Sequence, residues 1–370
     1  MERKKKILAV VGTRADAVKM CPLINELRGR EELSVSVCST GQHRELLNSV
    51  LDIFGVIPDY SLDIMAEGQD LFDITVRLLS ALRGLLEDEA PDAVMVHGDT
   101  ATAFSAALAA FYKRIPVCHV EAGLRTYDLS SPFPEEFYRQ AIGLLASYHF
   151  APTEAARGNL LSEGVAEECV FVTGNTVVDA LAETVGRSGS IGNSLFDFAS
   201  EGRLILLTAH RRENQGDAMR NIFSAVLRIL EEYEDVRVIY PVHPSPAVRL
   251  VAEEFFSGHP RVRLCEPLGT LEFHRLLSLC YLTLTDSGGV QEEAVSLCRP
   301  ALVIRNTTER TEGVLSGGIR LVGVGEGSVY RGIRALLDSP SLYYAMTRGA
   351  SPFGSGGASE KIADIMEKII

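Results

Sequence analysis

The stretch RLILLTAHRRENQGDAMRNIFSAVLRILEEYEDVRVIYPVH, residues 203–243, has two apolar runs on either side of a segment with helical spacing. Each run, 203–210 and 236–243, is apolar at consecutive positions, as strands buried on both faces of a parallel sheet are. The segment between them, 219–233, repeats apolar residues every three or four positions and so forms one apolar stripe along a helix. A strand, a helix and a second strand in this order predict an α/β fold with parallel strands covered by helices.

The same alternation continues along the chain, which at 370 residues is too long for one ordinary core. The Gly- and Ser-rich stretch GRSGSIGNS, residues 186–194, has no such periodicity and lies near the middle. We therefore predict two doubly wound, Rossmann-like domains, residues 1–168 and 169–355, that face each other across a deep cleft. The predicted strands are 7–12, 35–39, 92–98, 116–123 and 169–174 in a first series, then 203–210, 236–243, 261–265, 281–287, 300–306 and 319–323.

Charge and composition exclude several classes of function. The formal net charge of −13 argues against a nucleic-acid or membrane-surface role. The seven cysteines are scattered and show no metal-ligand spacing, which favours reduced thiols in a cytoplasmic protein. The apolar run after the basic N-terminus is too short for a signal peptide, and no run approaches the roughly 18 residues of a membrane span.

Ligands of doubly wound sheets bind beyond the carboxyl ends of the strands, so the polar residues there are the candidates for function. The first strand ends in GTRADAVKM, where Arg14 and Lys19 flank the start of a helix. These two side chains indicate either an anion contact at a positive helix end or ordinary solvated basic residues. The dinucleotide fingerprint G-x-G-x-x-G is missing from this turn, so we expect no nicotinamide cofactor there.

Carboxylates follow two further strands of the first series. Asp99, in HGDTAT, suits either a helix N-cap or a catalytic role. Glu121, in HVEAGLRT, comes directly after an apolar strand and needs a partner, which is either a substrate group or Arg125 four residues on. Glu135 and Glu136, after Pro134 in SSPFPEE, suit the first turn of a helix. Several carboxylates at one sheet edge can divide acid and base roles between them.

The second series ends in groups that suit a nucleotide. LLTAHRREN gathers His210, Arg211 and Arg212 at a strand end, which favours a phosphate contact, whereas His243 in YPVHPSP is expected on an exposed turn.

TDSGGVQEEA, residues 285–294, places a hydroxyl and two glycines at a strand-to-helix turn. Ser287 and the amides of Gly288 and Gly289 are expected to cradle a phosphate at the helix N-terminus. Glu293 is then placed for ribose hydroxyls, and Glu292 is expected on a solvated helix face. Two nucleotide-type domains with an anion site and carboxylates predict a nucleotide-activated substrate.

Taken together, these segments resemble the non-hydrolysing UDP-N-acetylglucosamine 2-epimerases over essentially the whole chain. The resemblance implies a GT-B fold, in which a C-terminal helix, here 356–370, returns to the first domain. It also implies interconversion of UDP-GlcNAc and UDP-ManNAc without NAD or metal, by elimination of UDP to a 2-acetamidoglucal and re-addition, in a homodimer. The motifs that occur in the family's order are GTR…KM, TGQHRE, VHGDT, AAFYKRIPVCHVEAGLRT, SPFPEE, VTGNTVVDAL, HRREN, YPVHPSP, TDSGGVQEEA and TTER.

The resemblance also implies a role for each matching residue. It places Arg14, Lys19 and His210 on the diphosphate and its developing charge. It gives acid and base roles on the sugar side to Asp99, Glu121 and Glu135, without deciding which is the acid. The implied contacts with phosphate, ribose and uracil are Ser287, Gly288, Gly289, Glu293, Arg310 and Phe273.

The chain departs from the family pattern at a few positions. Tyr138 replaces the usual Asn and is expected to reshape the sugar pocket, which leaves open a modified sugar such as a 2,3-diacetamido uronic acid. Ala15 and Asp16 replace Pro-Glu, and Glu45 and Gly68 make allosteric control by UDP-GlcNAc doubtful. A hydrolysing relative that releases ManNAc remains an alternative, although that class tends to have Arg where Thr100 stands. A GT-B glycosyltransferase is a more distant one.

Overall fold

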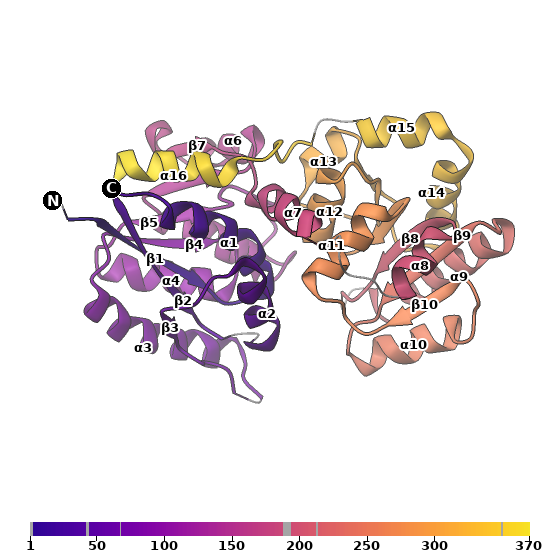
Figure 1. Cartoon of the computed structure of the whole chain (residues 1–370), viewed down its shortest axis with the longest axis horizontal. Helices are drawn as coiled ribbons and strands as arrows, with labels where there is room; N and C mark the ends of the chain where they lie inside the picture. The colour runs from indigo at the N-terminus through magenta and orange to yellow at the C-terminus, as the bar shows by residue number, and fades with distance from the viewer. Residues whose placement is uncertain (1–2, 42–43, 67, 188–193, 212–213, 349–350) are drawn as a thin grey trace. The chain divides into compact units, whose positions relative to one another are not determined.

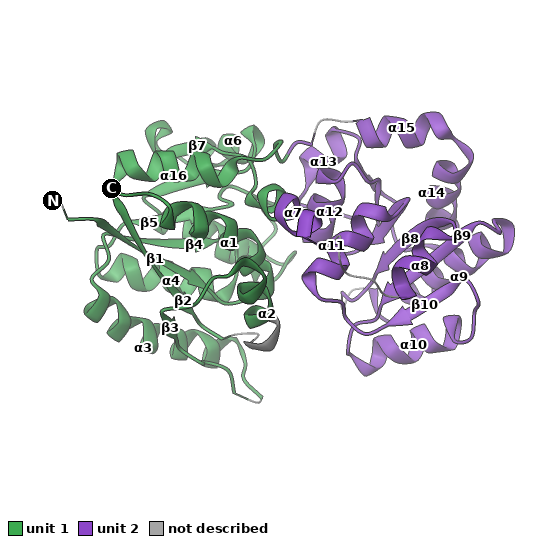
Figure 2. Ribbon diagram, in the orientation of Figure 1, with its two compact units in different colours: residues 1–180, 353–370 green, residues 181–352 purple. Residues whose placement is uncertain are grey.

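The computed structural model describes residues 3–41, 44–66, 68–187, 194–211, 214–348 and 351–370. The chain forms two compact units (Figure 2): residues 1–180 with 353–370, and residues 181–352. Most of the predicted linker, 188–193, lies outside the described residues.

The first unit is built on a parallel sheet of seven strands within its described residues, in the order β3-β2-β1-β4-β5-β6-β7. The order reverses between β1 and β4, which are hydrogen-bonded neighbours, so their carboxyl ends form a topological switch point. The strands are β1 (Lys5–Val11), β2 (Leu33–Ser39), β3 (Tyr60–Ser61), β4 (Ala93–His97), β5 (Val117–Val120), β6 (Tyr148–Ala151) and β7 (Val170–Val172).

Helices cover both faces of this sheet (Figure 1). Ile7, Ala9 and Val11 of β1 pack in one core with α1 and α2, and Leu8 and Val10 pack in another with α3 and α4. This split follows from the alternation of side chains along a strand. The helices are α1 (Arg14–Arg28), α2 (Arg44–Phe54), α3 (Leu71–Glu89), α4 (Ala101–Tyr112), α5 (Glu135–Leu145) and α6 (Glu154–Ser162), with the 3₁₀ turn η1 (Glu167–Cys169).

The C-terminal helix α16 (Ala358–Ile369) belongs to the first unit. Its Ile362, Ala363 and Met366 are fully buried in the core that also contains the apolar face of α1. Asp179 fixes the entry to the helix by accepting hydrogen bonds from the backbone N–H groups of Gly357 and Ser359, at 2.6 and 2.7 Å. Residues far apart in sequence therefore share one core.

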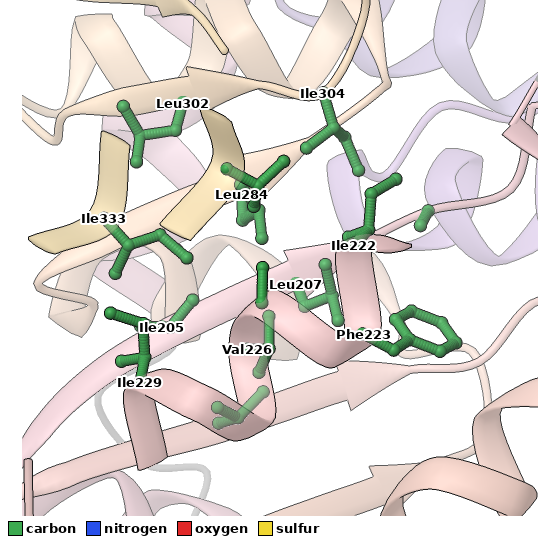
Figure 3. Packing of buried hydrophobic residues seen from close by; sticks show 14 of the residues in the cluster. Ile205, Leu207, Ile222, Phe223, Val226, Ile229, Leu284, Leu302, Ile304 and Ile333 are labelled. Carbon is green, nitrogen blue, oxygen red and sulfur yellow. The ribbon is translucent and has the colours of Figure 1, made fainter. Parts of the chain in front are cut away.

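The second unit repeats the architecture on a parallel sheet of six strands in its described part, ordered β10-β9-β8-β11-β12-β13. Ile205 and Leu207 of β8 pack against the stripe of α9 that contains Ile222, Val226 and Ile229 (Figure 3). The strands are β8 (Arg203–Thr208), β9 (Val236–Pro241), β10 (Val262–Cys265), β11 (Leu282–Thr285), β12 (Ala301–Val303) and β13 (Ile319–Leu321).

One helix, α7 (Thr176–Arg187), passes from the first unit into the second. The others of the second unit are α8 (Ser194–Ser200), α9 (Asp217–Glu232), α10 (Pro246–Phe256), α11 (Thr270–Leu279), α12 (Gly288–Ser296), α13 (Thr311–Leu315), α14 (Glu326–Asp338) and α15 (Pro340–Arg348). In the helices of the described residues, we find no segment both long and apolar enough to cross a membrane.

The predicted α/β class with two parallel sheets is confirmed, and every predicted strand has a counterpart within a few residues. The strands β3 and β6 were missed, because a two-residue strand and the sequence YHFA have no run of Val or Ile. β7 pairs with β6, so residues 170–172 lie in the sheet of the first unit, whereas the predicted domain boundary assigned them to the second domain.

Candidate active site

In the first unit, the polar residues that follow β1, β4 and β5 lie at one edge of the sheet, because these three parallel strands are neighbours. Close packing fixes the turn after β1. A Cβ on Gly12 would stand 2.1 Å from the Thr102 hydroxyl oxygen, so only glycine fits between β1 and α4. Arg14 follows as the first residue of α1 and is partly buried.

Glu121 is enclosed by the side chains of Lys19, Asn175 and His97. Its side chain is 7% exposed, and its Oε2 forms an ion pair with Lys19 Nζ, whose side chain is 8% exposed. The same oxygen accepts a 2.9 Å hydrogen bond from Asn175 Nδ2 and lies 3.8 Å from His97 Nε2. The backbone at Glu121 is left-handed, with φ of 63°, a conformation that costs a non-glycine residue free energy and is common at functional sites.

Two simpler interpretations of these residues are wrong. Arg125 does not pair with Glu121 but binds Glu163 through two 2.8 Å hydrogen bonds. Lys19 is buried rather than solvated, because it is the cation that compensates Glu121.

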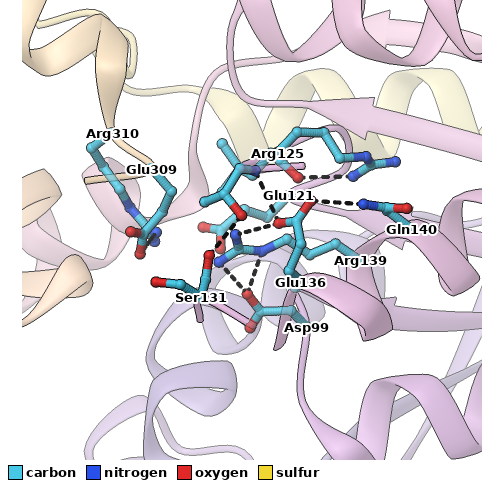
Figure 4. Close-up of polar contacts among 12 residues, drawn as sticks. Asp99, Glu121, Arg125, Ser131, Glu136, Arg139, Gln140, Glu309 and Arg310 are labelled. Atoms are coloured by element: carbon cyan, nitrogen blue, oxygen red, sulfur yellow. Dashed lines mark hydrogen bonds and ion pairs between the residues drawn. The ribbon is translucent and has the colours of Figure 1, made fainter. Parts of the chain in front are cut away.

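Asp99 follows β4 and binds Arg139 (Figure 4). Its Oδ2 accepts from Arg139 Nε at 2.6 Å and lies 2.6 Å from Nη2. It does not cap α4, since Thr100 is the N-cap and accepts from the N–H of Ala103. The carboxylate of Asp99 is therefore free of a capping role, and Arg139, a residue that sequence reasoning missed, orients it.

Glu135 and Glu136 begin α5 and have different environments. Glu136 is fully buried and accepts hydrogen bonds of 3.0 Å from the N–H groups of Thr126 and Tyr127, besides its ion pair with Arg139. Burial alone raises the pKa of Glu136, but bonds from Gln140 and these two amides outweigh it and lower the pKa. Glu136 therefore orders the loop before α5, and its hydrogen bonds favour the ionised form.

Glu135 has one buried oxygen, Oε2, that finds no hydrogen-bond partner among the described residues. Unpaired buried polar atoms are rare in folded proteins and need an explanation.

Tyr138 lies within electrostatic range of Glu135: burial, and after it the charge of this glutamate, raise the pKa of the Tyr138 hydroxyl. Its ring stacks on Phe104 at 5.1 Å between centroids and belongs to the apolar core under α4 and α5. The effect of Tyr138 on the sugar pocket stays a prediction.

Asp16 is a buried group that the sequence interpretation noted only as a departure. It completes a capping box with Thr13 at the start of α1 and accepts further hydrogen bonds from the N–H of Gly12 and the Thr100 hydroxyl. Burial, opposed by the bonds from Thr13 and Gly12 and reinforced by nearby Asp99, raises the pKa of Asp16 to about 6.

In the second unit, His210 follows β8 and has a fully buried partner. Its Nδ1 lies 3.1 Å from Asp286 Oδ1, and its ring stacks on that of His243 at 5.8 Å between centroids. His243 is exposed, as expected. Arg211 donates from Nε to the backbone oxygen of Asp286, and the predicted third basic residue, Arg212, lies outside the described residues.

The turn of TDSGGVQEEA has the predicted geometry. Ser287 is the N-cap of α12, its side chain makes no capping hydrogen bond, and Gly288 and Gly289 open the helix. A Cβ on Gly288 would stand 3.0 Å from Glu309 Oε1 and 3.2 Å from Arg310 Nη1. Arg310 is therefore packed against the N-terminal turn of α12, where a helix attracts anions.

Arg310 is itself enclosed by carboxylates. It donates from Nε to Glu292 Oε1 at 2.8 Å and from Nη1 to Glu309 Oε1 at 2.5 Å, and both glutamates are buried. The expectation that Glu292 is solvated is thus wrong, because Glu292 holds this arginine.

Two candidates remain, Glu293 on α12 and Phe273 on α11. Glu293 is partly buried, with its carboxylate 3.6 Å from His274 Nε2. Phe273 lies next to His274 on α11 and is 9% exposed.

Each unit thus brings its own predicted residues together. The first joins Lys19 to Glu121 and sets Asp99 and Glu135 around Arg139 and Glu136. The second joins His210 to the Ser287 turn through Asp286 and sets Arg310 beside Gly288. The structure adds five residues to the candidate site: Asn175, His97, Arg139, Asp286 and Glu309. Asp286 could have been found from the sequence, because it directly follows an apolar strand.

Two parallel sheets with flanking helices place the chain in the class of GT-B-like α/β proteins. The family model "UDP-N-acetylglucosamine 2-epimerase" matches residues 25–367, and the chain belongs to this family.

Individual relatives agree over nearly the full length. A UDP-N-acetylglucosamine 2-epimerase of Bacillus subtilis is 49% identical over 98% of this chain and 95% of its own. Two solved structures are also similar, each with a TM-score of 0.93. The S. aureus MnaA-UDP co-structure is 46% identical over 98% of this chain and 96% of its own. The UDP-GlcNAc 2-epimerase from Neisseria meningitidis bound to UDP-GlcNAc is 42% identical over 98% of this chain and 100% of its own. The predicted GT-B-like fold is confirmed.

Proposed function

We propose that the protein interconverts UDP-N-acetylglucosamine and UDP-N-acetylmannosamine by removing and restoring the proton at C2 while UDP leaves C1 and returns. The observation that carries this proposal is Glu121, a carboxylate buried beside Lys19 and Asn175 in a left-handed turn at the end of β5. A buried ionisable group with a specific partner at a strand end is the usual form of a catalytic residue. Family membership and a structural relative bound to UDP-GlcNAc support the same substrate.

The chemistry requires two kinds of assistance. The C2 proton is not acidic, so its removal needs a positioned base together with stabilisation of the departing diphosphate. We assign proton transfer at C2 to Glu121, Asp99 and Glu135. Asp99 is held by Arg139, whereas Glu135 has an oxygen without a hydrogen-bond partner in the described structure, so the three carboxylates differ in ways that can separate acid from base.

The leaving UDP needs cations and amides. We assign its diphosphate to Arg14, Lys19 and His210 and to the amides that follow Ser287, with Arg310 reinforcing the positive end of α12. We assign the ribose to Glu293 and the uracil to Phe273. No redox cofactor is needed in this scheme, because the same carbon loses and regains a proton.

A hydrolysing enzyme is the second candidate, and it would release free ManNAc and UDP. The residue after Asp99 is Thr100, which is occupied as the N-cap of α4. Since the hydrolysing class tends to have Arg at this position, we favour the non-hydrolysing reaction.

Product analysis tests the proposal. The enzyme is incubated with UDP-GlcNAc and sampled at early times by ³¹P and ¹H NMR. We expect UDP-ManNAc as the first product, in a reversible approach to equilibrium. Free ManNAc appearing first would favour the hydrolysing reaction, and turnover only of a 2,3-diacetamido uronic acid substrate in a panel of UDP-sugars would change the substrate.

A further inference from the structure

The buried carboxylate of Asp286 is an ionisable group that the scheme above leaves without a role. It is 0% exposed and follows β11 directly. Because β11 pairs in parallel with β8, with Thr285 opposite Thr208, the residues after the two strands lie side by side. This register places Asp286 next to His210.

The two carboxylate oxygens of Asp286 have different neighbours. Oδ2 accepts hydrogen bonds from the N–H groups of His210 and Arg211, at 2.8 and 2.9 Å, and from Asn214 Nδ2 at 3.0 Å. Oδ1 lies 3.1 Å from His210 Nδ1, within ion-pair distance, but makes no hydrogen bond of good geometry to any described residue. One oxygen therefore fixes the backbone after β8, and the other faces the imidazole ring.

These bonds keep Asp286 ionised despite its burial. Burial raises the pKa of Asp286, but the neighbouring His210 ring and the amides of Arg211 and His210 outweigh it, so the pKa lies below its usual value. An ionised carboxylate can only accept a hydrogen bond. The negative charge 3.1 Å from Nδ1 therefore favours a proton on that nitrogen over its lone pair, and Nε2 lies on the other side of the ring.

Other titratable groups around the pair are few in the described part of the chain. His243, from the end of β9, stacks on the His210 ring, and Tyr240 of β9 donates its hydroxyl to the Ala209 carbonyl at 2.6 Å. Arg211 binds the backbone of Asp286 rather than its carboxylate through Nε. Among these groups, the carboxylate of Asp286 is the anion that lies beside Nδ1 of His210.

We propose that Asp286 is a positioning residue whose carboxylate keeps a proton on Nδ1 of His210 and orients the ring, so that a second proton, taken up at Nε2, makes that nitrogen a charged donor to the departing diphosphate. This inference rests on the function proposed above. Proton position on a histidine is set by the partner of the other nitrogen, and a wrong tautomer leaves the geometry intact while removing the chemistry. The ring can then stabilise the charge that appears on UDP as the C1–O bond breaks.

The experiment compares the wild type with Asp286→Asn and Asn214→Ala by ¹⁵N NMR of histidine-labelled enzyme, without substrate and at a pH where imidazole is neutral. The His210 signals are assigned with His210→Gln. We expect Nδ1–H in the wild type and in Asn214→Ala, which loses one bond to Oδ2 but keeps the Oδ1 contact. In Asp286→Asn we expect Nε2–H, because the amide group donates to Nδ1.

Turnover provides the second readout. We expect kcat of Asp286→Asn to fall about 10²–10⁴-fold, with the affinity for UDP changed less than about tenfold, and a far smaller loss in Asn214→Ala. Nε2–H in the wild type, or equal losses in both variants, would overturn the inference, and the wild-type result applies even if Asp286→Asn does not fold. If the wild type shows Nδ1–H but does not epimerise UDP-GlcNAc, the proposed function fails and the Asp286–His210 assignment stands.

Discussion

At the scale of the single residue, Glu121 is the central group of the proposed mechanism. A carboxylate this deeply buried is costly unless it is paired and hydrogen-bonded, and here Lys19 and Asn175 supply both. The sequence signal was a glutamate directly after an apolar strand. No local sequence pattern identifies the partners of Glu121, because Lys19 and Asn175 lie 102 and 54 residues away along the chain.

Replacing Glu121 by Gln should remove proton transfer while leaving nucleotide binding. We expect kcat to fall about 10²–10⁴-fold. The affinity for UDP, measured by calorimetry, should change little, because the assigned uridine and ribose contacts lie in the second unit. The matched control is Glu167→Gln, an exposed glutamate paired with Arg157 in the same unit. Full turnover in Glu121→Gln would remove this residue from the mechanism.

Asp16 should make the stability of the protein depend on pH. Burial raises its pKa in the folded state to about 6 from an ordinary value of 3.8, so the fold favours the protonated form. The stabilisation from this group is therefore present below pH 4 and lost as the pH rises through 6, by about 2–3 kcal/mol.

The Asp16→Asn variant should not lose stability in this way as the pH rises, because its amide does not titrate. The difference in the free energy of unfolding, variant minus wild type, should increase between pH 4 and pH 7, measured by denaturant titration. Asp73→Asn is the matched control, since Asp73 occupies the same capping-box position at the exposed start of α3. A difference for Asp16→Asn that is independent of pH would contradict the raised pKa.

At the scale of elements, the helix N-terminus of α12 is shaped by the side chains packed on it. Glu292 and Glu309 hold Arg310 against Gly288, so that the amides and the cation face the same region. The sequence indicated the glycine turn. It did not indicate the carboxylates that fix Arg310, because an ion pair between α12 and the loop before α13 depends on tertiary packing.

Gly288→Ala tests this arrangement. The added methyl group would press on Glu309 and Arg310 at 3.0–3.2 Å, so we expect the affinity for UDP to fall about tenfold, equivalent to about 1.4 kcal/mol. Gly158→Ala serves as the control, because no atom lies within 4 Å of the added Cβ in α6. That control should keep its UDP affinity and gain about 0.5–1 kcal/mol of stability. Unchanged affinity in Gly288→Ala would show that Arg310 does not shape the site.

Helix α16 gives a prediction about packing. Ile362 is fully buried against the core of the first unit, so Ile362→Ala should cost about 2–5 kcal/mol of that unit's stability. Ile57→Ala, at a side chain 78% exposed, should change it by less than about 0.5 kcal/mol. Hydrogen exchange resolved by segment measures each unit separately. Equal protection from hydrogen exchange in Ile362→Ala and Ile57→Ala would mean that α16 does not complete the core of the first unit.

At the scale of the whole molecule, the sequence predicted the two parallel sheets because hydrophobic periodicity is strong in long alternating segments. The predicted site residues lie at strand ends, as the doubly wound architecture requires. Several wrong expectations about the site concerned side-chain partners. Arg125 binds Glu163, Thr100 rather than Asp99 caps α4, and Glu292 is buried, because side-chain pairing depends on tertiary contacts that no local pattern contains.

The central claim is that C2 loses its proton to the enzyme while UDP departs, and the most direct test is turnover of UDP-GlcNAc in deuterated water, followed by ¹H NMR and mass spectrometry. The account predicts that UDP-ManNAc carries deuterium at C2 from the first turnovers, and that recovered UDP-GlcNAc acquires it as the reaction reverses. UDP-ManNAc that retains its original proton at C2 would contradict the account.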